Sequence, residues 1–94
     1  MRVGLLTVTL RLPGVSSLKE KRAIVRHLVA SVARRGTAVA VAEIDELDEI
    51  QRATLRIAHL SNDVRRTESV LSKALEGLGK HRDVGVLSSD LEIL

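Results

Sequence analysis

The sequence predicts an α+β domain in which two helices cover one face of a four-stranded antiparallel sheet. Two stretches repeat apolar residues at spacings of three and four, as amphipathic helices do, and four other segments show strand-like patterns. Their order is strand, helix, strand, strand, helix, strand. Because 94 residues suffice for one hydrophobic core, we expect a single domain spanning residues 1–94.

The first predicted strand runs from Leu5 to Leu12 and is stopped by Pro13-Gly14. Its even-numbered positions are leucine or valine, whereas positions 7, 9 and 11 are threonine, threonine and arginine. Alternation with a period of two indicates a strand that is buried on one face only, as in an antiparallel sheet with one covered side.

A helix is predicted from Leu18 to about Arg35. Ser17 can cap it, and Glu20, three residues on, can reach back to the cap amide in a capping box. We expect Gly36 to end the helix. The apolar stripe consists of Ile24, Val25, Leu28, Val29 and Val32. The cations expected to lie away from this stripe are Lys21, Arg22, Arg26 and Arg34.

The second half of the chain repeats the pattern. Residues 37–43 form a second strand of small and β-branched residues, and an acidic segment leads to a third strand over residues 51–59. The Ser61-Asn62-Asp63 segment offers cap residues for a second helix, which extends to about Leu78. The last strand, residues 84–94, changes phase, and a bulge around Ser88-Ser89 would reconcile its two halves.

This element order predicts a ferredoxin-like βαββαβ two-layer sandwich. Right-handed crossovers place the first and third strands at the centre, giving the strand order 4-1-3-2. The central strands then expose a polar, cationic open face made of Thr7, Thr9, Arg11, Arg52, Thr54 and Arg56. A slip of one residue would bury this polar set, so the phase is strictly defined.

Composition excludes several classes of function. Phe, Trp and Tyr are absent, which excludes an RNA-recognition-motif mechanism because that module stacks bases on aromatic residues of its sheet. The lack of cysteine excludes disulfides and thiolate metal sites and fits a reducing compartment. No segment resembles a signal peptide or a membrane span, so we expect a cytoplasmic protein without membrane contact.

Charge is separated along the chain. Six basic residues and one acidic residue lie between Ser17 and Arg35, whereas residues 43–49 hold five acidic residues. Cations at the start of a helix oppose its dipole, so their concentration there favours an anion-binding role. The alternative is that both charged blocks are simply solvated faces, which is the commoner case for charge runs. The phosphate-binding residues predicted near the helix start are Lys19, Lys21, Arg22 and Arg26. Those predicted on the sheet face are Arg11, Arg52 and Arg56.

Catalytic and metal-binding patterns are weak. His27, His59 and His81 share no metal-ligand spacing, and we expect each to be an ordinary surface or boundary histidine. The acidic residues 45–49 lack the glycine turn and the bidentate glutamate of a calcium loop, so a solvated hairpin is favoured over a Mg²⁺ site. We therefore expect no enzyme activity, no metal and no cofactor.

The segments LRLPGVSSLKEKRAIV, VAVAEI, QRATLRIAHLSND and LEIL together resemble the YlxP-like family of small bacterial proteins, a domain of uncharacterised function. The resemblance runs essentially from end to end and implies a ferredoxin-like fold. Genes of the family often lie beside genes for translation initiation and ribosome maturation factors, which implies contact with RNA or the ribosome. Many members carry Trp immediately before the glutamine, where this chain has Ile50.

Three hypotheses of function follow. In the first, the protein binds structured RNA or a ribosomal particle through phosphates, using the seven cations named above. In the second, the open sheet face is a protein interface, for a homodimer or an acidic partner, without RNA. The third, ranked last, is a small hydrolase or a metal- or ligand-binding domain that uses the acidic segment.

Overall fold

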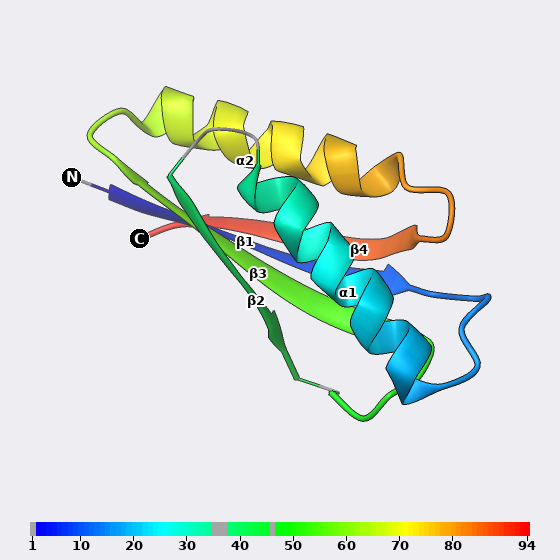
Figure 1. Cartoon of the computed structure of the whole chain (residues 1–94). Helices are drawn as coiled ribbons and strands as arrows, with labels where there is room; N and C mark the ends of the chain where they lie inside the picture. The colour runs from blue at the N-terminus through cyan, green and yellow to red at the C-terminus, as the bar shows by residue number, and fades with distance from the viewer. Residues whose placement is uncertain (1, 35–37, 46) are drawn as a thin grey trace.

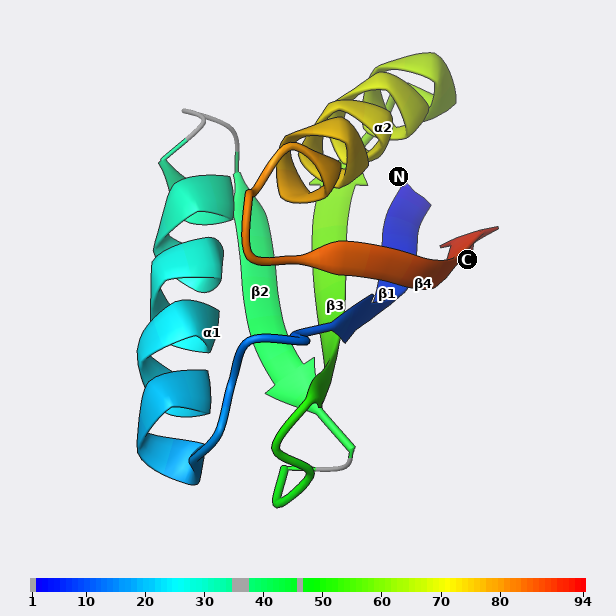
Figure 2. The same ribbon diagram turned by 90° about the vertical axis from the view of Figure 1, so that its right-hand side faces the viewer.

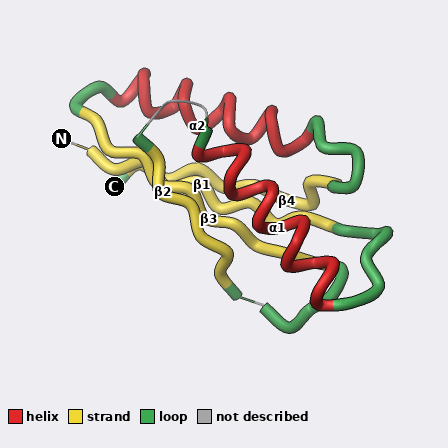
Figure 3. The backbone as a smooth tube through the Cα atoms, viewed as in Figure 1, coloured by secondary structure: helices red, strands yellow, loops and turns green. Residues whose placement is uncertain are grey.

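The computed structural model describes residues 2–34, 38–45 and 47–94 (Figure 1). It has the predicted ferredoxin-like order of strands and helices. The elements are β1 (Arg2–Arg11), α1 (Leu18–Ala33), β2 (Val39–Ile44), β3 (Arg52–Ser61), α2 (Val64–Gly79) and β4 (Gly85–Ile93). Both helices lie on one side of the sheet (Figure 3). The sheet is strongly twisted, so that β4 crosses the direction of β2 and β3 in the view of Figure 2.

The sheet has the order β2-β3-β1-β4, and every neighbouring pair is antiparallel. The predicted strand order, with β1 and β3 at the centre, is confirmed. The predicted phase is confirmed as well, because Leu10, Ala53 and Leu55 are fully buried under the helices. Thr7 and Arg56 are direct partners across β1 and β3 and face the other side. The period-two pattern of these strands thus identified the covered face.

The pairing of β1 with β4 contains the expected irregularity. Thr9 pairs with Ser88, and Leu10 pairs with Val86, so Leu87 is an extra residue on β4. The bulge therefore lies at Leu87, directly before the predicted Ser88-Ser89. It turns the apolar residues on either side of it to the same helix-covered face, which explains the change of phase in the sequence.

Both helices begin at side-chain caps. The Ser17 hydroxyl accepts a hydrogen bond from the Glu20 amide at 3.2 Å, as predicted. The Glu20 carboxylate does not reach back to the cap amide but accepts a hydrogen bond from the Ser16 hydroxyl at 2.7 Å. At α2, the Asp63 carboxylate accepts from the amide of Arg65 at 3.0 Å. The predicted helix end at Gly36 lies outside the described residues.

Element boundaries differ from the prediction by a few residues. β1 already begins at Arg2, and β3 continues to Ser61. The early residues of β1 lie under α2, where a Cβ on Gly4 would collide with Thr67 and Leu71. This glycine lets the helix pack closely on the strand. In the part of the chain that the structure describes, no helix is long and apolar enough to cross a membrane.

Candidate nucleic-acid interface

The open face of the sheet carries arginines from both central strands. Arg11 and Arg52 are direct partners across β1 and β3, so their side chains emerge side by side. Arg56 lies two positions further along the same face, about 13 Å from Arg52 at the usual rise of a strand. Its Nε donates a hydrogen bond to the Thr7 hydroxyl at 3.1 Å, which fixes its direction across the sheet. The structure therefore brings the three predicted sheet cations onto one exposed face.

A hollow of about 390 Å³ lies at the Arg11 end of this face, lined by Arg11, Glu49, Gln51, Arg52 and Leu87. The bulge in β4 explains the presence of Leu87, since it brings this residue beside the two arginines. Gln51 joins the hollow to the loop that leads from β1 to α1. Its side-chain Nε2 donates to the Val15 carbonyl at 3.1 Å, and its backbone carbonyl accepts from the Leu12 amide at 2.8 Å. No sequence motif indicated Gln51 or Leu87 as part of this hollow.

The opposite end of the open face is apolar. A hollow of about 240 Å³ there is lined by Leu5, Ala40, Val41, Ala42, Ile44, Arg56 and Ala58. Thr54, predicted on the polar face, is only 7% exposed because it lies between its partners Thr9 and Ile44. The face thus has a cationic end and an aliphatic end.

Three helix cations share one exposed stripe of α1. Lys19, Arg22 and Arg26 are all exposed. At 100° per residue, their spacings of three and four residues place them within an arc of about 60° on the helix surface. Three positive charges in one narrow arc suit a chain of phosphates.

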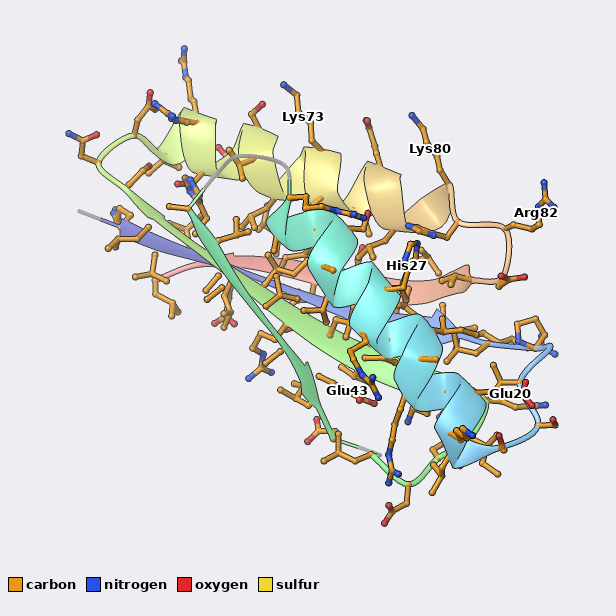
Figure 4. The ribbon with its side chains drawn as sticks, viewed as in Figure 1. Glu20, His27, Glu43, Lys73, Lys80 and Arg82 are labelled. Atoms are coloured by element: carbon orange, nitrogen blue, oxygen red, sulfur yellow. The ribbon has the colours of Figure 1, made fainter. Side chains whose placement is uncertain are left out.

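Lys21 does not belong to this stripe, and its predicted orientation away from the apolar residues is wrong. Its side chain is 1% exposed, with Nζ 3.1 Å from Glu43 Oε2 and donating to the Leu47 carbonyl at 3.3 Å. Figure 4 shows Glu43 reaching from β2 toward α1. The buried stripe of α1 consists of positions 21, 25, 28 and 32. Lys21 lies four residues before Val25 and so on the same side of the helix, and this spacing was the sequence signal for its burial. Lys21 is therefore a structural residue.

The two groups of cations meet at one end of the molecule but in different layers. The first turn of α1 lies at the end of the sheet where β1 stops and the β2–β3 loop runs (Figure 1). Lys21 contacts this loop at Leu47, and Arg11 and Arg52 stand on the far side of the sheet. A ligand that touches both groups must therefore wrap around this end.

One of the three histidines differs from the expectation. His59 is 4% exposed, and its Nδ1 lies 2.9 Å from the Thr67 hydroxyl. That hydroxyl is in turn 2.8 Å from the Ser61 hydroxyl. The result is a buried polar chain under α2. His27 and His81 are in edge-to-face contact with ring centres 5.4 Å apart, and His27 is labelled in Figure 4.

No cluster of three or more metal-ligating side chains occurs among residues 2–34, 38–45 and 47–94. The acidic segment lies only partly in these ranges, because position 46 is outside them. Asp45 adopts a positive φ of 51° where the chain leaves β2, a conformation that aspartate tolerates better than most residues. The described part of this segment is exposed, as expected of a solvated turn.

Comparisons with known proteins place the chain in a family. A search among curated proteins gave no match. A family model described as "Protein of unknown function (DUF503)" matches residues 3–91, which is nearly the whole chain and includes every helix and strand at least in part. The YlxP-like resemblance of the sequence points to the same family. The protein is therefore a member of the DUF503 family.

Proposed function

We propose that this protein is a non-catalytic RNA-binding protein that contacts the phosphates of structured RNA, including RNA in a ribosomal particle. The exposed stripe of Lys19, Arg22 and Arg26 on α1 is the observation that carries the proposal. Arg11 and Arg52 of the sheet face lie at the same end of the molecule as the first turn of α1. Phosphate contacts supply most of the affinity of sequence-independent RNA binding, and they need cations on an accessible surface.

The chemistry of the face favours phosphate over base recognition. The sequence has no Phe, Trp or Tyr on which a base could stack. Arginine, in contrast, binds phosphate oxygens through two parallel N–H donors, and Arg11 and Arg52 present two such groups beside one hollow. Thr7 restricts the Arg56 side chain, so less conformational freedom is lost when a phosphate binds it.

Binding of a structured RNA, followed over a series of salt concentrations, tests the proposal. Replacing Lys19, Arg22 and Arg26 by glutamine should weaken binding at low salt at least tenfold and make the salt dependence shallower, since each lost phosphate contact removes about 0.7 to 0.9 from the slope of log K against log salt. Co-sedimentation with ribosomal particles in low salt, lost as salt is raised, provides the parallel assay.

A matched control is available on the other helix. Lys73, Lys80 and Arg82 are exposed on α2 and the loop after it, and Figure 4 shows them pointing away from α1. Replacing these three by glutamine changes net charge by the same amount at a different surface. If both triple variants weaken binding equally, net charge rather than the α1 stripe is responsible, and the proposal fails.

A protein partner on the open face is the second candidate. The aliphatic hollow around Ala42, Ile44 and Ala58 favours it, because an exposed apolar surface is better suited to another protein than to phosphate. In this case Ala42→Glu should abolish a dimer or a complex without changing RNA affinity. An unchanged oligomeric state and an unchanged set of bound proteins would exclude this candidate.

A further inference from the structure

The outer edge of β4 is the most exposed strand surface of the molecule. Of its nine residues, eight are exposed, and Ile93 is half-buried. Among the described residues, six large apolar side chains are exposed. Four of them lie on β4 or directly after it: Val86, Leu87, Leu91 and Leu94. The other edge strand, β2, has only six residues and is half-buried at most positions. A long edge without lysine, arginine or proline is open to pairing with another chain.

The register identifies which backbone groups of this edge point outward. The Leu94 amide donates to the Val3 carbonyl at 2.8 Å, so this pair is a hydrogen-bonded pair of the antiparallel ladder. Hydrogen-bonded and non-hydrogen-bonded pairs alternate along such a ladder. Glu92, Asp90 and Ser88 therefore direct their backbone groups at β1. The amides and carbonyls of Ser89, Leu91 and Ile93 point away from β1, toward a strand position next to β4.

The side chains along this outer edge of β4 differ between the two faces of the sheet. Leu91 pairs with Leu6 and stands on the helix side of the sheet, where it is 38% exposed. Asp90 and Glu92 pair with Thr7 and Leu5 and stand on the open side. A strand added here would meet an aliphatic surface on one face and two carboxylates on the other.

A second copy of the chain fits this edge poorly. A two-fold pairing sets one residue of the edge opposite its own copy, at a hydrogen-bonded or a non-hydrogen-bonded position of the ladder. Centring on Asp90 or Glu92 sets that carboxylate directly opposite its own copy, which is unfavourable. Centring on Leu91 sets Asp90 of each copy opposite Glu92 of the other, and directly opposed like charges are destabilising. Centring on Ser89 runs the pairing into the bulge at Leu87, which interrupts the ladder. Centring on Ile93 places half of the pairing beyond the end of β4.

We propose that the β4 edge binds an extended segment of a partner protein in which aliphatic residues alternate with lysine or arginine. The segment adds a fifth strand to the sheet. Its backbone bonds to Ser89, Leu91 and Ile93, its aliphatic residues extend the layer under α2, and its cations face Asp90 and Glu92. Strand addition of this kind takes its affinity from main-chain hydrogen bonds and its specificity from alternate side chains.

The probe is a capped synthetic peptide of sequence Thr-Val-Lys-Leu-Lys-Val-Thr, titrated into the full-length protein. Amide hydrogen exchange read by NMR distinguishes strand addition from loose charge attraction. Saturating peptide should slow exchange at least tenfold at the amides of Ser89, Leu91 and Ile93. The amides of Ser88, Asp90 and Glu92 already bond to β1 and should change little.

Two controls make the test decisive. Methylating the leucine amide of the peptide removes one ladder donor at constant charge and should weaken binding at least tenfold. The Asp90→Lys, Glu92→Lys double variant should lose the basic peptide and bind its glutamate counterpart. Both positions are exposed, so the thermal unfolding curve of the double variant should match that of the parent.

Equal binding of the methylated peptide, or no protection at Leu91, would overturn the proposal. So would a peptide-free dimer that Leu91→Lys dissociates, which would assign the edge to a second copy.

Discussion

At the scale of single residues, the interior contains polar groups whose partners come from other elements. Lys21 lies on the buried stripe of α1, and its charge is balanced by Glu43 from β2. Glu43 Oε2 accepts no hydrogen bond of good geometry from the described residues, so charge attraction rather than a directed bond holds the pair. The carbonyl of Leu47 supplies a further acceptor. Replacing both partners of a buried pair by apolar residues is often neutral for stability, whereas removing only one partner is costly.

Removing one partner of this pair should be costly. Lys21→Met keeps the aliphatic stem packed but leaves the Glu43 carboxylate without its cation. We expect a loss of about 3 kcal/mol in urea unfolding, the low end for breaking a buried pair, because Glu43 retains some contact with water. Lys21→Met combined with Glu43→Met should regain most of the loss. If the single variant unfolds like the parent, the pair is not a determinant of stability.

The buried chain of His59, Thr67 and Ser61 gives a second prediction at this scale. Thr67→Val is nearly isosteric but removes the hydroxyl that both neighbours contact. The buried His59 Nδ1 then has no partner, and we expect a loss of about 1 to 3 kcal/mol in unfolding free energy. Ser72→Val, on the exposed face of the same helix, is the control and should change stability by less than about 0.5 kcal/mol. Equal effects of both changes would indicate a loss of helix propensity alone.

At the scale of elements, the phase of β3 decides which residues form the core. Leu55 is fully buried beneath the helices, and its neighbour Arg56 is exposed on the other face. Leu55→Ala should cost about 2 to 5 kcal/mol, the range for truncating a core leucine. Arg56→Ala should change the free energy of unfolding by less than about 0.5 kcal/mol. Chemical denaturation of the two variants measures both values, and a small effect at Leu55 would contradict the assigned phase.

Periodicity predicted the covered face of the sheet, because it is a local pattern that repeats over many residues. The strand order followed from the order of elements with right-handed crossovers, and the caps followed from single residue types. The orientation of Lys21 was predicted wrongly because a lysine is expected to be exposed unless a buried acidic partner is known. Its partner Glu43 lies on β2, and their contact follows from the tertiary arrangement rather than from any local pattern. Likewise, nothing local to Leu87 indicates that it stands beside Arg11 and Arg52. Contacts between distant elements therefore determined what the sequence alone did not predict.

At the scale of the whole molecule, the exposed cations proposed to bind phosphate form two groups in different layers, the α1 stripe and the sheet arginines. An RNA that wraps from one layer to the other contacts both groups, whereas an RNA that lies on one layer contacts only one. The two arrangements predict different salt dependences, because each phosphate contact contributes separately to counterion release.

We expect one RNA to contact both layers. Arg52→Gln with Arg56→Gln, and separately Lys19→Gln with Arg22→Gln, should each reduce the slope of log K against log salt by about 1.4 to 1.8, at about 0.7 to 0.9 per contact. The quadruple variant should show the sum, since the groups are too far apart to share a phosphate. Fluorescence anisotropy with one RNA hairpin at several salt concentrations measures all three. A slope that changes for only one pair would place the RNA on that layer alone, and an unchanged slope for both would remove phosphate binding from both layers.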